Sequence, residues 1–226
     1  MPPRRLDRAA LAEGTRALAR CDPDLGRLHA RLGVPPMWGR QPGFAALVRI
    51  ILEQQVSLDA ARTLFRRLVA HAGTMTPSAL HALGIQGLRD FGLTRQKASY
   101  CHGLAARILD AELDLARVAA APDEEGRTML RAVPGIGPWS VDIYYLMALR
   151  RPDVWPQGDL ALAVALRDVK RLDTLPDRDA QQAIAAAWAP WRSVAARLLW
   201  AHYLDARGKY AAAGKQATAG KQATAV

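Results

Sequence analysis

The segment 133–139 constrains the fold of this chain more than any other part of the sequence. It reads Val-Pro-Gly-Ile-Gly-Pro-Trp and lies between two amphipathic stretches. Pro134 discourages continuation of the preceding helix, and Pro138 suits the first position of a new one. Gly135 and Gly137 permit backbone angles that a side chain would penalise. The pattern therefore predicts a hairpin between two helices, whose exposed backbone N–H groups suit an anion such as a phosphate.

The remainder of the sequence predicts an all-α protein. Ala and Leu are abundant, β-branched runs are scarce, and no segment alternates convincingly with period two. Ser57 and Thr94 are typical helix caps, and Gly92 is typical of a helix end. We expect about ten helices, including segments near 7–20, 23–32, 95–109, 138–150, 160–171, 177–188 and 191–206.

The chain is long enough for a sizeable core and carries a large positive charge. Its 226 residues suffice for one large domain or for two small lobes. Lys and Arg total 31 against 21 Asp and Glu, a formal net charge of +10. Such a surplus favours a polyanionic partner, and nucleic acid is the commonest one. A basic solubility surface would look the same, so the charge supports the hairpin argument but does not replace it.

The cysteines, the histidines and the N-terminus exclude several classes of protein. Cys21 and Cys101 form no Cys-x-x-Cys pair, which argues against structural zinc, an iron–sulfur cluster and a disulfide framework. The five histidines show no HExxH spacing, so we expect no metal site built from side chains. The N-terminus lacks a signal peptide, and no apolar run of about 18 residues is present. We expect a soluble, cytoplasmic protein without a membrane partner.

The hairpin has partners at fixed spacing. Leu130 precedes it, Trp139 follows it, and Asp159 lies about 20 residues further on in Gln-Gly-Asp. With these partners the chain resembles the helix-hairpin-helix, Gly/Pro-rich-loop, Asp superfamily of DNA glycosylases. It resembles most the DNA-3-methyladenine glycosylase II branch, which removes alkylated bases. The resemblance runs from about residue 43 to 206, and the stretches that agree are 44–57, 88–104, 130–141, 155–159 and 190–200.

The resemblance implies that Asp159 is the catalytic residue. Cleavage of an N-glycosidic bond builds positive charge on the sugar, so a fixed carboxylate stabilises the transition state more than the ground state. It can also orient or deprotonate an attacking water. The alternative is that Asp159 only caps the helix beginning at Leu160. The two roles are compatible, because a capped aspartate is also a pre-oriented one.

Trp139 distinguishes between two mechanisms within the superfamily. Members that also nick the backbone carry a lysine at this position, and its amine forms a Schiff base with the sugar. No lysine occurs between Lys97 and Lys170, so we expect a monofunctional enzyme that uses water. An indole also suits a cationic alkylated purine, since a cation–π contact contributes about 0.5–2 kcal/mol. The resemblance implies that Trp139 and Trp200 hold the base, although the sequence alone leaves Trp200 undecided between cleft and core.

Other site residues follow from the same resemblance. Gln55 occupies the slot where the family inserts a wedge into the duplex, and an ordinary exposed loop residue is the alternative. A pocket tyrosine of some relatives is Ile143 here, with Tyr144 adjacent, so Tyr144 is the candidate for base binding. In relatives the hairpin carbonyls can hold a monovalent cation, and no other cofactor is expected. The expected DNA-binding residues of the hairpin are Gly135, Ile136, Gly137 and Ser140.

We expect two helical lobes with a DNA-binding cleft. Residues 43–155 would form the central lobe, with the helix-hairpin-helix at about 123–150. The N-terminal helices within 1–42 would pack with the C-terminal lobe, 156–208, which carries the aspartate. The tail, 209–226, contains a repeat of 213–218 as 219–224 with no large apolar side chain, and we expect it to be disordered.

The function implied is that of a monofunctional DNA glycosylase, a hydrolase that removes cationic alkylated bases from double-stranded DNA in base excision repair. We expect a monomer, associated with the nucleoid if the source is bacterial. Two alternatives remain. One is a glycosylase for neutral or mismatched bases, and the other is a helix-hairpin-helix DNA-binding protein without catalytic activity.

Overall fold

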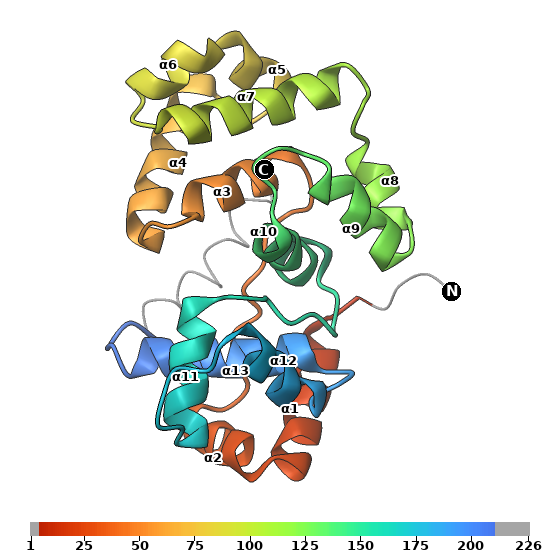
Figure 1. Ribbon diagram of the computed structural model, residues 1–226, viewed down its shortest axis with the longest axis vertical. Coiled ribbons are helices and arrows are strands. Elements are labelled where there is room, and N and C mark those ends of the chain that lie inside the picture. The colour runs from red at the N-terminus through yellow and green to blue at the C-terminus, as the bar shows by residue number, and fades with distance from the viewer. Residues whose placement is uncertain (1–4, 211–226) are drawn as a thin grey trace. The chain divides into compact units, whose positions relative to one another are not determined.

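The computed structural model describes residues 5–210 and is helical throughout that range, without a β-strand. The all-α prediction is confirmed. Figure 1 shows the helices in chain order from red to blue. They are α1 (Arg8–Cys21), α2 (Pro23–Leu32), α3 (Phe44–Glu53), α4 (Leu58–Ala72), α5 (Pro77–Ala82), α6 (Gly84–Asp90), α7 (Arg95–Leu109), α8 (Leu115–Ala120), α9 (Asp123–Arg131), α10 (Pro138–Ile143), the π-helical η1 (Tyr144–Leu149), α11 (Leu160–Lys170), α12 (Arg178–Ala186) and α13 (Arg192–Asp205).

The described residues divide into two compact units. Unit 1 consists of Arg40–Tyr144, and unit 2 consists of residues 5–39 together with 145–210. The division falls between Tyr144 and Tyr145, at the start of the π-helical segment η1, whereas the sequence analysis placed it after residue 155. Almost all of the predicted disordered tail, residues 211–226, lies outside the described range.

Helix starts follow the capping residues of the sequence. Ser57 and Thr94 accept hydrogen bonds from Ala60 N and Lys97 N, as expected of N-caps. The sequence analysis did not predict α6 or the six-residue α8 as separate helices. It predicted one helix over 138–150, and the π-helical η1 occupies the second half of that segment. Short helices offer too few residues for a periodic pattern, and a π-helical turn depends on its packing rather than on local composition.

Unit 1 is built around α3. Eight of its ten residues are buried, and the helix contacts α4, α7 and α10. Its last residue, Glu53, is also buried, and the carboxylate pairs with Arg40 at 2.6 Å and with Arg49 at 3.2 Å. Helix α3 ends at Glu53, and the loop with Gln54 and Gln55 follows directly. The packing of Glu53 therefore fixes where this loop leaves the core of the unit.

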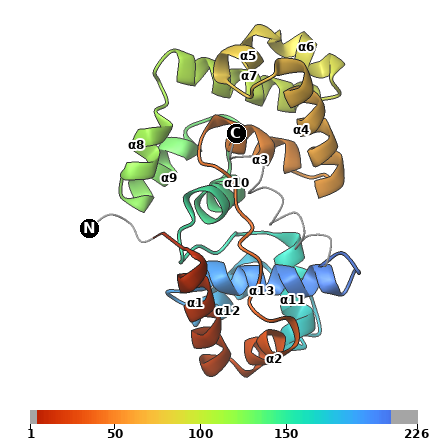
Figure 2. The same cartoon turned by 180° about the vertical axis from the view of Figure 1, so that it is seen from behind.

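Unit 2 is built around α13. This helix contacts α1, α2, α11 and α12, and the red α1 and α2 lie beside the blue α13 in both Figure 1 and Figure 2. Arg197 on α13 is fully buried and donates hydrogen bonds to the carbonyls of Trp38 and Leu146. Burial, with a smaller effect of the Arg150 charge, lowers the pKa of Arg197 to about 9. Trp188 and Trp191 of the same unit are buried as well.

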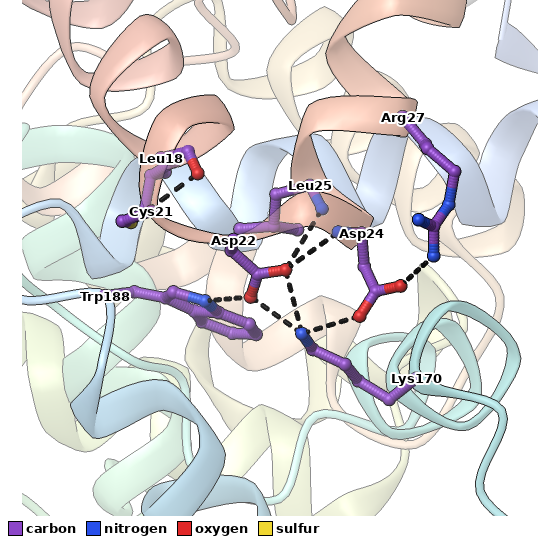
Figure 3. A network of polar contacts seen from close by, with 8 residues as sticks. All are labelled: Leu18, Cys21, Asp22, Asp24, Leu25, Arg27, Lys170 and Trp188. Carbon is purple, nitrogen blue, oxygen red and sulfur yellow. Dashed lines mark hydrogen bonds and ion pairs between the residues drawn. The ribbon is translucent and has the colours of Figure 1, made fainter.

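A polar network joins the N-terminal helices of unit 2 to α11 (Figure 3). Asp22 caps α2 through the amides of Asp24 and Leu25, and its other oxygen accepts from Trp188 Nε1 at 2.8 Å. Lys170, the last residue of α11, donates to both oxygens of Asp22 at 2.8 and 2.7 Å and to Asp24 at 2.9 Å. The far end of α11 is therefore anchored to α2.

We expect Asp22→Asn to destabilise the protein at neutral pH but not in acid. Burial alone would raise the pKa of the Asp22 carboxyl, but hydrogen bonds from Lys170, Trp188 and the amide of Leu25 hold it below its ordinary value. A lowered folded-state pKa means that the carboxylate stabilises the fold above its unfolded-state pKa and loses this effect as pH falls through the folded-state value. Urea unfolding should show a loss of about 1–2 kcal/mol at pH 7 that shrinks below about pH 4. A pH-independent difference would contradict this assignment.

Two further observations concern metals and membranes. Within residues 5–210, no group of three or more His, Cys, Asp or Glu side chains is placed to hold a metal ion. Within the same residues, no helix has both the length and the apolar character needed to cross a bilayer.

Candidate glycosylase site

The hairpin of unit 1 joins α9 to α10 through a turn that requires glycine. Gly135 has a φ of 87°, in the left-handed region that a side chain disfavours. A Cβ at this position would also lie 2.3 Å from Cγ of Tyr100 on α7. Gly137 is the N-cap of α10 and has no side chain to accept the first amides of that helix. These amides form the kind of helix start that binds an anion.

The side chains of two other hairpin residues, Ile136 and Ser140, lie in the interior of unit 1. The amide of Ile136 donates to the carbonyl of Val133 at 3.0 Å, and its side chain is buried. Ser140 is buried as well, and its hydroxyl accepts a hydrogen bond from Gln54 Nε2 at 2.9 Å. The side chains of Ile136 and Ser140 therefore support the turn from within. Their contribution to DNA binding stays a prediction.

An ion pair holds the two helices of the hairpin together. Arg127 on α9 and Asp142 on α10 form a hydrogen-bonded pair with an N–O distance of 2.5 Å. Asp142 is buried, so removal of Arg127 would leave a carboxylate in a poorly solvated position. The pair fixes the angle at which α10 leaves the turn.

The carbonyls of the turn already accept hydrogen bonds. Gly135 O accepts from Gln54 Nε2 at 2.8 Å, and Val133 O accepts from the amide of Ile136. Each carbonyl oxygen has two lone pairs, so one N–H donor leaves a second lone pair for another ligand. Binding of a monovalent cation by the turn therefore stays a prediction, and we derive no catalytic step through one.

The loop between α3 and α4 carries the predicted wedge residue. Gln55 is exposed and has a φ of 56°, an uncommon conformation for a residue with a Cβ. Val56 and Leu58, which follow it, are exposed apolar side chains. The loop thus presents Gln55 at its tip, although its role as a wedge stays a prediction. The sequence analysis missed the neighbouring Gln54, whose side chain turns back to the hairpin.

The two aromatic candidates of unit 1 lie in different environments. Trp139 is half-buried in the first turn of α10. Tyr144 is 0% exposed, and its hydroxyl accepts a hydrogen bond from the amide of Gly43 at 3.1 Å. Burial raises the pKa of Tyr144, against the smaller effect of this hydrogen bond. Of the two rings, only that of Trp139 has an accessible surface; base binding by Tyr144 stays a prediction.

Unit 2 brings Asp159 and Trp200 together. Asp159 is the N-cap of α11, and its Oδ1 accepts from the amide of Leu162 at 3.0 Å. The same oxygen accepts from Nε1 of Trp200 on α13 at 3.3 Å. Both side chains are half-buried. The capping role is therefore confirmed, and the carboxylate is oriented by donors from two helices.

An arginine and an exposed apolar side chain lie next to Asp159 in unit 2. Gly158 has a φ of 74°, and the guanidinium of Arg178 lies over it, 3.2 Å from where a Cβ would be. Leu160, directly after the aspartate, is 68% exposed. Sequence reasoning missed Arg178, because nothing in its local sequence distinguishes it from other surface arginines.

Several known proteins resemble this chain in sequence. The sequence matches the family described as "HhH-GPD superfamily base excision DNA repair protein" over residues 48–192. YfjP of Bacillus subtilis (strain 168), whose name assigns it provisionally to the DNA-3-methyladenine glycosylases, is 30% identical over 165 residues, 70% of this chain and 58% of its own length. DNA-3-methyladenine glycosylase 1 of Schizosaccharomyces pombe is 26% identical over 161 residues, 70% of this chain and 71% of that protein.

Among solved structures, a protein of the same kind has a similar fold. The solved structure of the 3-methyladenine DNA glycosylase Mag1 of Schizosaccharomyces pombe, in complex with abasic DNA, superimposes with a TM-score of 0.78. It is 24% identical, and the match covers 83% of this chain and 95% of that one. At this level of identity the likeness shows the fold alone. The family match spans more than half of the chain and includes the hairpin and Asp159. The chain belongs to the HhH-GPD superfamily of base excision DNA repair proteins.

Proposed function

We propose that this protein is a monofunctional DNA glycosylase that hydrolyses the N-glycosidic bond of cationic, 3-methyladenine-type bases in DNA. The observation that carries the proposal is the orientation of Asp159 by the Leu162 amide and the Trp200 indole. A carboxylate held by two donors is fixed before the substrate arrives, and a fixed charge stabilises a transition state without reorganisation. The names of the relatives support the choice of substrate.

The chemical step needs only one carboxylate. As the bond between C1′ and the base nitrogen breaks, its electron pair moves to the base, which leaves as a neutral molecule. Positive charge develops on the sugar, and the Asp159 carboxylate stabilises it. Water adds to C1′ and loses its proton to Asp159 or to solvent. Because the alkylated base is already cationic, it is a good leaving group, and normal purines should be released far more slowly.

The base would be held by indole rings. We propose that Trp139 and Trp200 stack on the extruded cationic base, with a gain of about 0.5–2 kcal/mol for each well-placed ring. Trp200 then has two functions, because its ring faces the base while its N–H orients Asp159. Tyr144, the third candidate for base binding, also supports the chain at Gly43 through its hydroxyl.

The remaining contacts that we propose are between unit 1 and double-stranded DNA. The hairpin amides at Gly135, Gly137 and Ser140 would bind a backbone phosphate near the lesion, and Gln55 would fill the space left by the extruded nucleotide. The net charge of +10 supports such a partner. A monomer suffices for this arrangement, acting where the DNA is, which in a bacterium is the nucleoid.

No covalent intermediate with the enzyme is proposed. Trp139 stands where a Schiff-base lysine would be required, and Lys97, the lysine of unit 1 that lies closest in the sequence, donates to the carbonyls of Leu52 and Gln54. These two hydrogen bonds hold the Lys97 amine at the C-terminal end of α3.

A base-release panel tests the proposal. We expect release of 3-methyladenine from methylated DNA, with little release from uracil-containing or mismatched duplexes. Borohydride should trap no covalent adduct with DNA. Faster release from the neutral or mismatched substrates would favour the alternative glycosylase, and a trapped adduct would contradict the monofunctional mechanism. DNA binding without release of any base would identify a non-catalytic binding protein.

A further inference from the structure

We infer that Gln54 and Lys97 are positioning residues that lock the wedge loop, 54–57, to the hairpin turn, 134–137, within unit 1. The inference rests on the proposed function in one respect, namely that the two segments contact the same DNA. Its structural basis is independent of that function, because it consists of four hydrogen bonds among three elements.

The first link runs from the wedge loop to the hairpin. The Gln54 side-chain amide donates to Gly135 O at 2.8 Å and to Ser140 Oγ at 2.9 Å. Gly135 lies in the turn before α10, and Ser140 lies in the first turn of that helix. One amide group therefore fixes both the turn and the start of the helix that would bind a phosphate.

The second link runs from α7 to the wedge loop. Lys97 Nζ donates to the carbonyls of Leu52 and Gln54, each at 2.7 Å. The ammonium group thus caps the C-terminal end of α3, where a positive charge is favourable. It also holds the backbone directly before Gln55, whose left-handed conformation needs support from its surroundings.

A third contact comes from the same helix as Lys97. The ring of Tyr100 on α7 packs against Gly135 so closely that a Cβ on the glycine would overlap it. Helix α7 therefore supports the wedge loop through Lys97 and the hairpin through Tyr100, and Gln54 joins the two. When the hairpin binds the phosphate, the tip of the wedge loop is already in register with the duplex.

We call these four hydrogen bonds the lock. The lock matters only where a base must be displaced from the stacked duplex. Single-stranded DNA needs no wedge, whereas a paired base must be extruded and its place filled. Loss of the lock should therefore weaken action on a duplex more than action on a single strand. A general loss of stability would affect both substrates equally, because each is measured with the same protein preparation.

The experiment compares Gln54→Met and Lys97→Met with Gln86→Met. Methionine keeps the approximate shape of glutamine and removes its donors, and Gln86 makes a similar hydrogen bond to Asp90 on the exposed face of α6. For each variant we would measure release of an alkylated base, and affinity for DNA containing an abasic site, on duplex and single-stranded forms.

We expect the duplex-to-single-strand ratio to fall about tenfold in Gln54→Met and in Lys97→Met, because each variant loses two hydrogen bonds to part-buried acceptors. The ratio should stay unchanged in Gln86→Met. An unchanged ratio in both lock variants would overturn the inference. If the wild type releases no alkylated base at all, the proposed function fails, and the affinity ratio still decides whether the lock operates.

Discussion

Asp159→Asn should lower the rate of base release by about 10²–10³-fold, the effect of removing one pre-oriented electrostatic contact to a transition state. The neutral amide cannot stabilise the positive charge that develops on the sugar, and it cannot accept a proton from water. The measurement is single-turnover release of 3-methyladenine from a methylated duplex.

The fold and the affinity for DNA should survive this substitution. Asparagine is as good an N-cap as aspartate, and its oxygen can still accept from the Leu162 amide and the Trp200 indole. The matched control is Asp168→Asn, which removes a half-exposed carboxylate from the same helix, where it pairs with its neighbour Arg167. Release at the wild-type rate by Asp159→Asn would refute the catalytic role, whatever the effect on binding.

The helical part of the fold was predictable because its signals are local. The segment 95–109 was predicted from the Gly92 stop and the Thr94 cap, and the structure places α7 over the same residues. The same holds for 23–32, where Pro23 follows the capping Asp22. Cap, stop and periodicity all lie within a few residues of one another, so the sequence contains the whole signal.

The support of the site was not predictable in the same way. The sequence pointed to Gln55 by its place between two helices, but the hydrogen bonds that shape that loop come from Gln54 and Lys97. Gln54 joins residues more than eighty positions away in the chain. Only the packing of α3 against α7 and α10 brings them together, and no local pattern encodes that packing.

Asp159 could be assigned from the sequence, whereas its hydrogen-bond partner Trp200 could not. The capping position of Asp159 was readable from the sequence, because an aspartate directly before a helix has few other local roles. Trp200, on a helix that is buried over most of its surface, could not be assigned to cleft or core from its periodicity. The hydrogen bond to Asp159 is what distinguishes it from Trp188, whose N–H serves the structural Asp22 instead.

Gly135→Ala should destabilise the protein by about 3 kcal/mol and abolish high-affinity binding to DNA. Two penalties combine. A φ of 87° is unfavourable for alanine, and the new methyl group would lie 2.3–2.8 Å from three carbon atoms of Tyr100. The Tyr100 ring cannot easily move, because its hydroxyl is held by Gln96 and its backbone belongs to α7.

The matched control for this substitution is Gly103→Ala on α7. A Cβ at Gly103 meets nothing within 4 Å, and the residue lies inside a regular helix. Alanine there should stabilise the protein by up to about 1 kcal/mol, since glycine weakens helix interiors. Urea unfolding gives the stabilities, and titration of a fluorescent duplex gives the affinities. If Gly135→Ala matches the wild type in both, the turn does not need its glycine, and the phosphate site proposed at the hairpin loses its structural basis.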